Sequence, residues 1–98
     1  FKPGGENVFP AVVEKVILEH PAVERSVVIG ITDPKWKEAI KAVCQLNSGQ
    51  NLTPEALIQF VGERIARYKK PQYVEFVSEM PVTVTGEIDR QKVKDLYG

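Results

Sequence analysis

The stretch Val23-Glu-Arg-Ser-Val-Val-Ile-Gly-Ile-Thr32 decides the fold of this chain of 98 residues. Its centre, Val27-Val28-Ile29, is a run of β-branched residues, which predicts a strand that is covered on both faces. Gly30 and the pair Asp33-Pro34 break this run. The rest of the chain supplies the elements that can pack against such a strand.

Two further strands are predicted. Residues 38–47 alternate between apolar and polar side chains, a pattern typical of a half-buried strand. One face carries Ile40, Ala42, Cys44 and Leu46, and the other carries Lys41 and Gln45. Cys44 is therefore expected in the core. Residues 73–77 form the third predicted strand.

Three helices complete the pattern. The first has Asn7 as its expected N-cap and Pro10 in its first turn, and Pro21 ends it. Its apolar face is expected to carry Phe9, Val13, Val16, Ile17 and His20.

A second helix is expected to begin with Thr53 as the cap and Pro54 as the first helical residue. Its buried stripe is Leu57, Phe60, Val61 and Ile65, and it is expected to end among Arg64, Arg67, Lys69 and Lys70 before Pro71. The last helix spans residues 89–97, around Val93 and Leu96. This order predicts a single α+β domain: a small sheet of about three strands flanked by helices, with a C-terminal hairpin-like turn and a short helix.

The composition excludes several classes of function. Thirteen Lys and Arg balance thirteen Asp and Glu, so no overall basic field attracts nucleic acid or an anionic membrane. No apolar run approaches the roughly 20 residues that span a bilayer, and no signal peptide is expected from the first residues. One cysteine and one histidine predict neither a disulfide nor a metal site. They suit a reducing compartment, and the expected location is the cytoplasm.

The stretch Pro81-Val-Thr-Val-Thr-Gly-Glu-Ile-Asp-Arg90 follows the third predicted strand. Its β-branched residues favour extended backbone, and Gly86 permits the positive φ of a tight turn. Glu87 and Arg90 are expected at or just beyond a loop tip. Asp89 is suited to cap the next helix, because its carboxylate can accept from N–H groups of the first turn. A solvated hairpin tip and a functional loop both fit these residues.

Two stretches together resemble a known family: Gly4-Gly-Glu-Asn-Val-Phe-Pro10 and the stretch 81–90. They are similar to the C-terminal domain of the adenylate-forming enzymes, which include acyl-CoA synthetases, luciferases and the adenylation domains of nonribosomal peptide synthetases. The resemblance covers the whole chain. Intermediate landmarks agree in order and spacing, namely His20-Pro-Ala-Val23, Asp33-Pro-Lys-Trp-Lys-Glu38 and Tyr68-Lys-Lys-Pro71.

The resemblance implies that residues 1–98 are the mobile lid of a longer AMP-forming acyl-CoA synthetase, an acid–thiol ligase for a fatty or aryl acid. Enzymes of this family use ATP to convert a carboxylic acid into an acyl-adenylate, and they then transfer the acyl group to coenzyme A. A large N-terminal domain holds most of the nucleotide and acid sites and is expected to bind Mg²⁺. That domain is the expected partner of the lid, and the lid alone is expected to be inactive.

The resemblance also gives Glu87 a catalytic position. The family's adenylation lysine follows the glycine of the last motif and bridges the substrate carboxylate and the α-phosphate, and this chain has Glu87 there. A carboxylate adds to the repulsion between two anions that a cation would relieve. Three interpretations stay open: an altered lysine, a natural synthetase weak in adenylation, or a member in which Lys92 or Lys94 substitutes.

The resemblance implies a coenzyme A site on another part of the lid. Its expected residues are Gly4, Gly5, Trp36, Lys69 and Lys70. In the family the glycine pair lines the pantetheine channel, the aromatic residue packs on the coenzyme, and the basic residues can meet its phosphates. Trp36 has the alternative role of covering the sheet edge. Lys37 stands where the family usually has glycine, and it either crowds the thiol channel or adds a phosphate contact.

Two other functions stay open. One is the lid of a carrier-protein-dependent adenylation enzyme, in which the pantetheine arm arrives on a protein. The other is a pseudo-enzyme that serves as an interaction module, in which Glu87 disables acid activation.

Overall fold

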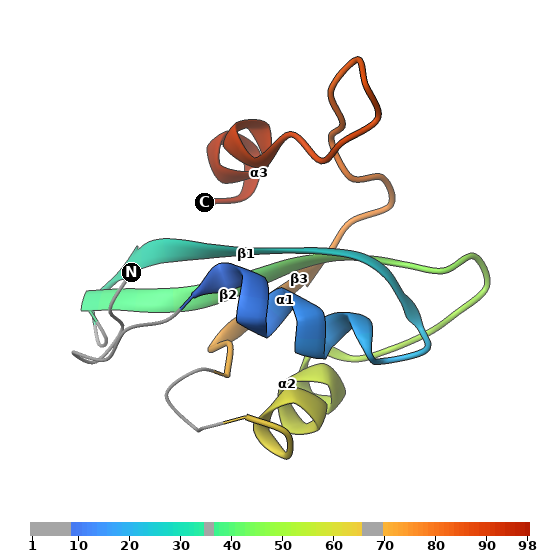
Figure 1. Ribbon diagram of the computed structural model, residues 1–98. Coiled ribbons are helices and arrows are strands. Elements are labelled where there is room, and N and C mark those ends of the chain that lie inside the picture. The colour runs from blue at the N-terminus through green and yellow to red at the C-terminus, as the bar shows by residue number, and fades with distance from the viewer. Residues whose placement is uncertain (1–8, 35–36, 66–69) are drawn as a thin grey trace.

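The computed structural model describes residues 9–34, 37–65 and 70–98. The elements in these ranges are α1 (Pro10–Leu18), β1 (Val23–Asp33), β2 (Lys37–Leu46), α2 (Pro54–Gly62), β3 (Tyr73–Phe76) and α3 (Arg90–Tyr97). β2 is the central strand of a mixed sheet, antiparallel to β1 and parallel to β3. Helices α1 and α2 cover one face of the sheet, and α3 lies over the other (Figure 1). The predicted α+β fold with three strands is confirmed.

The first core lies between the sheet and the helices α1 and α2. Val13 and Ile17 lie one helical turn apart on α1, and Leu57 and Val61 are spaced in the same way on α2, so each pair forms a buried stripe. The side chains from the sheet that meet them are Val23, Val28, Ile40, Ala42 and Cys44. The core position predicted for the cysteine is therefore confirmed.

The second core lies on the opposite face, under α3. Its buried members are Val27, Ile29, Val43, Met80 and Val93. Because the run 27–29 contributes to both cores, β1 is covered on both faces, as its apolar run predicts.

Strand β2 is also covered on both faces, so the prediction of a half-buried strand is wrong. Lys41 and Gln45 lie on the face that carries the second core, and each has a partner there. Lys41 Nζ donates to the Tyr97 carbonyl at 2.6 Å and lies 2.8 Å from a Glu75 carboxylate oxygen. Gln45 Oε1 accepts from the Met80 N–H at 2.7 Å. These partners allow polar residues to alternate along a covered strand.

Helix α1 begins at Pro10, and Phe9 takes the N-cap position without a side-chain hydrogen bond. Asn7, the predicted cap, lies outside the described residues. Phe9 is 62% exposed, so its predicted place on the buried face is wrong. Phe9 precedes the first helical residue and has extended backbone, so the helical spacing that places Val13 and Ile17 on one face does not apply to it.

The caps of the other two helices were predicted correctly. Thr53 Oγ1 accepts from the Ala56 N–H at 3.1 Å at the start of α2. That helix ends at Gly62, which is earlier than the basic residues predicted to close it. In α3, Val93 is buried, whereas Leu96 is exposed and lies outside the predicted core.

Candidate functional site

The stretch 81–90 forms a closed hairpin that leads into α3. The Thr83 N–H donates to the Glu87 carbonyl at 2.7 Å, and the Asp89 N–H donates to the Pro81 carbonyl at 2.9 Å. An antiparallel bridge between Val82 and Ile88 lies between these two bonds. The hairpin projects beyond α3, on the side of the sheet opposite α1 and α2 (Figure 1).

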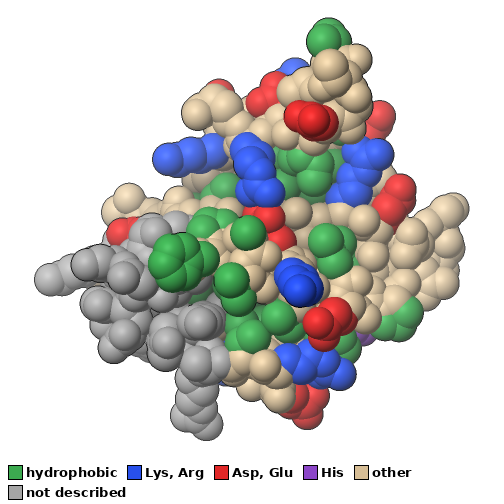
Figure 2. Space-filling model, in the orientation of Figure 1, with side chains coloured by type: hydrophobic (Ala, Val, Ile, Leu, Met, Phe, Trp, Pro, Cys, Tyr) green, Lys and Arg blue, Asp and Glu red, His purple; other side chains and the backbone are tan. Residues whose placement is uncertain are grey.

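The tip of the hairpin is a tight turn. Gly86 has a φ of 87° and donates its N–H to the Thr83 carbonyl at 3.0 Å. The hydroxyl oxygens of Thr83 and Thr85 lie 2.9 Å apart, so one donates to the other. Val84 is fully exposed, and Figure 2 shows a hydrophobic side chain at the end of this projection. The turn is thus fixed by its own backbone while it presents its side chains to the surroundings.

Glu87 lies at the end of this turn and is exposed. Its carbonyl holds the hairpin closed, and its carboxylate adds a negative charge beside the tip. A carboxylate in that place can attract a cation or a hydrogen-bond donor, but it repels phosphate and carboxylate groups. The residue therefore does not suit a site that must bring two anions together.

The base of the hairpin joins α3 through Asp89. Its side chain accepts from the Lys92 N–H at 3.1 Å and caps the helix, as predicted. Arg90 is the first residue of the helix. It lies at the hairpin base and not at the tip.

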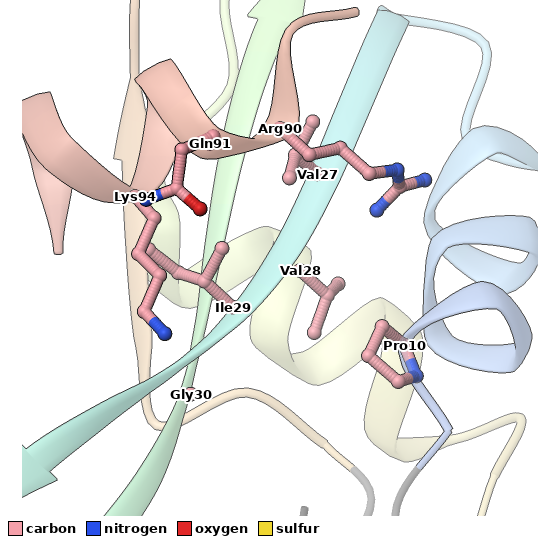
Figure 3. A pocket seen from close by; sticks show the side chains of 8 residues that line it. All are labelled: Pro10, Val27, Val28, Ile29, Gly30, Arg90, Gln91 and Lys94. Atoms are coloured by element: carbon pink, nitrogen blue, oxygen red, sulfur yellow. The ribbon is translucent and has the colours of Figure 1, made fainter.

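Arg90 extends past β1 to Glu14 on α1, as Figure 3 shows for the arginine side chain. Its two terminal nitrogens donate to the two Glu14 carboxylate oxygens at 2.8 and 2.6 Å. Glu14 is buried and also accepts from the Val28 N–H at 2.8 Å. The hydrogen bonds to Glu14 raise the pKa of the Arg90 guanidinium above its usual value. One carboxylate thus links α1, β1 and α3.

A shallow pocket of about 260 Å³ lies between α3 and β1. Residues 27–30 of β1 form its floor, and its rim carries Pro10, Arg90, Gln91 and Lys94 (Figure 3). Lys94 extends over β1 towards Gly30, away from the hairpin (Figure 3). This placement disfavours Lys94 as a substitute for a lysine at position 87.

The predicted coenzyme A residues are only partly within the described ranges. Gly4, Gly5, Trp36 and Lys69 lie outside them. Lys70 is half-buried just before β3, and its carbonyl accepts from Gln72 Nε2 at 3.2 Å. The Lys70 side chain lies beside α2, because a Cβ added at Gly62 would be 3.2 Å from Lys70 Cδ. The hairpin lies on the α3 side of the sheet (Figure 1). Of the predicted coenzyme A residues, the described one, Lys70, therefore lies on the other side of the sheet from the hairpin.

No cluster of three or more potential metal ligands occurs among the described residues. Nor does any helix within those residues have the length and apolar character needed to cross a membrane.

The sequence reasoning did not find Glu14. Its neighbours Val13 and Ile17 mark the buried face of a helix, and an acid beside that stripe is a signal that a buried partner is required. That partner, Arg90, is 76 residues away. Nothing in the local pattern connects the two.

Comparison with known proteins shows the family to which this chain is similar. Residues 12–87 match the family described as the AMP-binding enzyme C-terminal domain. The feruloyl-CoA synthase of an Amycolatopsis species is 39% identical over 95 residues, which are 97% of this chain and 19% of that protein. The mitochondrial medium-chain acyl-CoA ligase ACSF2 of Danio rerio is 36% identical over 94% of this chain and 15% of its own length. The chain thus spans less than one fifth of these relatives.

Solved structures of two synthetases also resemble this chain. A fatty acyl-CoA synthetase of Mycobacterium tuberculosis superposes with a TM-score of 0.90 and 35% identity, covering 99% of this chain and 19% of that one. The amide bond synthetase McbA of Marinactinospora thermotolerans gives a TM-score of 0.86 and 36% identity over 94% of this chain and 19% of its own. These relatives favour a synthetase domain over the carrier-protein lid or the interaction module.

Proposed function

The chain belongs to the family of AMP-binding enzyme C-terminal domains, and we propose that residues 1–98 are the C-terminal lid of a longer AMP-forming acyl-CoA synthetase. The proposed reaction converts a carboxylic acid, with ATP, into an acyl-adenylate and then into a coenzyme A thioester. The observation that carries this proposal is the likeness of nearly the whole chain to such enzymes. The large domain of the longer protein is its proposed partner, and fatty and aryl acids are its proposed substrates.

The two faces of the domain suit two half-reactions. The hairpin lies on the α3 side of the sheet (Figure 1), and the Lys70 side chain lies beside Gly62 of α2. We assign the hairpin face to adenylation and the face that carries Lys70 to thioester formation. The ammonium group of Lys70 suits a phosphate of coenzyme A, so this residue is a candidate to hold it.

The adenylation face does not suit its expected ligand. ATP supplies the adenylyl group in the proposed reaction, with Mg²⁺ expected on the large domain. Glu87 presents a carboxylate where the α-phosphate and the acid substrate would meet. At about 4 Å, a unit charge pair is worth on the order of 4 kcal/mol at an effective dielectric near 20, and glutamate makes this contribution unfavourable. We therefore assign Glu87 no step in adenylation.

The test compares the longer enzyme carrying Glu87 with its Glu87→Lys variant. Pyrophosphate release with ATP and an acid measures the first half-reaction, and thioester formation from supplied acyl-adenylate and coenzyme A measures the second. We expect Glu87→Lys to raise the first rate by about 10²- to 10³-fold, the range typical of one electrostatic contact in the transition state. The second rate should be equal in both forms.

Glu79→Lys is the matched control for this charge change. Glu79 is also exposed and precedes the hairpin, so its replacement changes the net charge equally without changing position 87. It should leave pyrophosphate release unaltered. If neither form makes adenylate or thioester with any fatty or aryl acid tested, the synthetase proposal fails.

A cytoplasmic location is proposed on a separate ground. The described cysteine, Cys44, is buried and free, and free cysteines suit a reducing compartment. Cell fractionation with an antibody against the chain would test this location.

A further inference from the structure

The two sequence motifs of the family precede two different helices. The glycine-rich motif that ends at Pro10 leads into α1, and the hairpin leads into α3. These helices lie on opposite faces of the sheet (Figure 1). They are nevertheless joined around β1 by the ion pair between Glu14 and Arg90.

The geometry of this pair restricts both side chains. The planar guanidinium of Arg90 meets the Glu14 carboxylate with two hydrogen bonds, which fix orientation as well as distance. Glu14 cannot turn away freely, because its side chain is only 8% exposed and one of its oxygens also accepts from the Val28 N–H. The carboxylate is thus attached to the sheet, and Arg90 is attached to the carboxylate.

The hairpin is held to the domain at both ends, and its Ile88 also packs against the second core. Its incoming end follows Met80, whose side chain is buried and whose N–H donates to Gln45 of β2. Its outgoing end is Asp89, whose N–H closes the hairpin base on Pro81 and whose side chain caps α3. Arg90 follows immediately, so its contact with Glu14 holds this outgoing end to α1.

We propose that Glu14 is a positioning residue for the hairpin: by holding Arg90, its carboxylate fixes the direction in which the hairpin presents residue 87. The effect on adenylation rests on the proposed function, but the positioning itself does not. A merely structural role would change the stability of the whole domain, whereas positioning changes the order of the hairpin more than that of the core.

The first experiment measures amide hydrogen exchange by NMR on the 98-residue chain. The variants are Glu14→Gln, which removes the charge, and Arg90→Lys, which keeps the charge and loses the two-pronged contact. In both, we expect the Thr83 and Asp89 amides to exchange about tenfold faster relative to the Val77 amide, because local opening of the hairpin becomes easier. The Val77 N–H is bonded to the Cys44 carbonyl within the core.

Glu75→Gln is the matched control, because it removes the carboxylate of another ion pair of similar contact length, the pair with Lys41, and Glu75 lies within strand β3 of the sheet. It should leave the ratio between hairpin and core exchange unchanged. Equal acceleration at hairpin and core amides, or no acceleration, in Glu14→Gln overturns the proposal. If Glu14→Gln does not fold, the same criteria apply to Arg90→Lys.

A second experiment uses the longer enzyme in the Glu87→Lys form. Glu14→Gln should lower kcat for pyrophosphate release by about 10- to 100-fold, since small misplacements of a catalytic group have effects of this size. Thioester formation from supplied acyl-adenylate should not change. If exchange changes as expected but the longer enzyme has no synthetase activity in any form, the proposed function fails and the positioning role stands. If Glu14→Gln slows both half-reactions equally, the role in positioning residue 87 is refuted.

Discussion

The contact between Glu14 and Arg90 predicts a measurable coupling energy in the stability of the domain. The perturbation is a double-mutant cycle of Glu14→Ala, Arg90→Ala and the double variant. The Glu14 side chain is 8% exposed and that of Arg90 is 57% exposed, so the pair is neither fully buried nor a surface pair. Loss of one partner from a buried pair costs about 3–5 kcal/mol, whereas exposed pairs contribute about 0–1 kcal/mol.

The contacts of each residue set the expected loss of stability in each single variant. Arg90→Ala leaves the buried Glu14 carboxylate with the Val28 N–H as its remaining described donor, so we expect a loss of about 2–3 kcal/mol. Glu14→Ala removes the acceptor of that N–H but leaves a guanidinium that water can reach, so we expect about 2 kcal/mol. The exposed arginine reduces the coupling energy to about 1–2 kcal/mol.

Urea denaturation of the four chains at neutral pH, followed by circular dichroism, measures these differences. A parallel cycle on Lys41 and Glu75 serves as the control, because that contact lies within the sheet and Lys41 retains the Tyr97 carbonyl. A coupling energy for Glu14 and Arg90 below about 0.5 kcal/mol would place the pair with ordinary surface ion pairs. The reasoning that one carboxylate holds α3 to α1 would then be refuted.

Three further predictions concern the same domain. Burial raises the pKa of the Cys44 thiol from 9.0 to about 11, so between these pH values the unfolded chain loses a proton that the folded chain keeps. Stability should therefore fall by up to about 2–3 kcal/mol as pH rises from 9 to 11, and denaturation of Cys44→Ala should show a smaller fall. Asp89→Ala removes the cap of α3 and should cost about 1 kcal/mol in urea denaturation. Gly86→Ala should cost about 1 kcal/mol through backbone strain alone, because φ is 87° there and an added Cβ meets nothing within 4 Å; a crystal structure of this variant should show a changed turn but an unchanged sheet.

The parts of the fold that were predicted from sequence depend on local chemistry. The caps at Thr53 and Asp89 and the apolar run of β1 each act within a few residues, and all three are confirmed. The error in β2 has a different cause. Lys41 and Gln45 look solvent-exposed in an alternating pattern, but each has a hydrogen-bond partner within residues 75–97. Periodicity cannot show such partners, since it reports polarity and not pairing.

In the candidate site, too, local sequence patterns predict the local structure but not the distant partners. The turn at Gly86 and the cap at Asp89 follow from residue type, so the hairpin itself was within reach of sequence reasoning. The contact of Arg90 with Glu14 could not be predicted in this way, because it joins residues 76 positions apart. The sequence reasoning therefore placed Arg90 near the loop tip, whereas the structure uses it as an anchor.

The structure also separates the shape of the hairpin from the chemistry of residue 87. The bonds that close the hairpin at this residue and at its base use backbone atoms, namely the Glu87 carbonyl, the Asp89 N–H and the Pro81 carbonyl. The Glu87 side chain is exposed and takes part in neither bond. A different side chain at this position can therefore be carried on the same backbone, with the same anchor at Arg90. For this reason the comparison of Glu87 with Glu87→Lys tests charge at a fixed geometry, and a change in rate can be assigned to the sign of that charge.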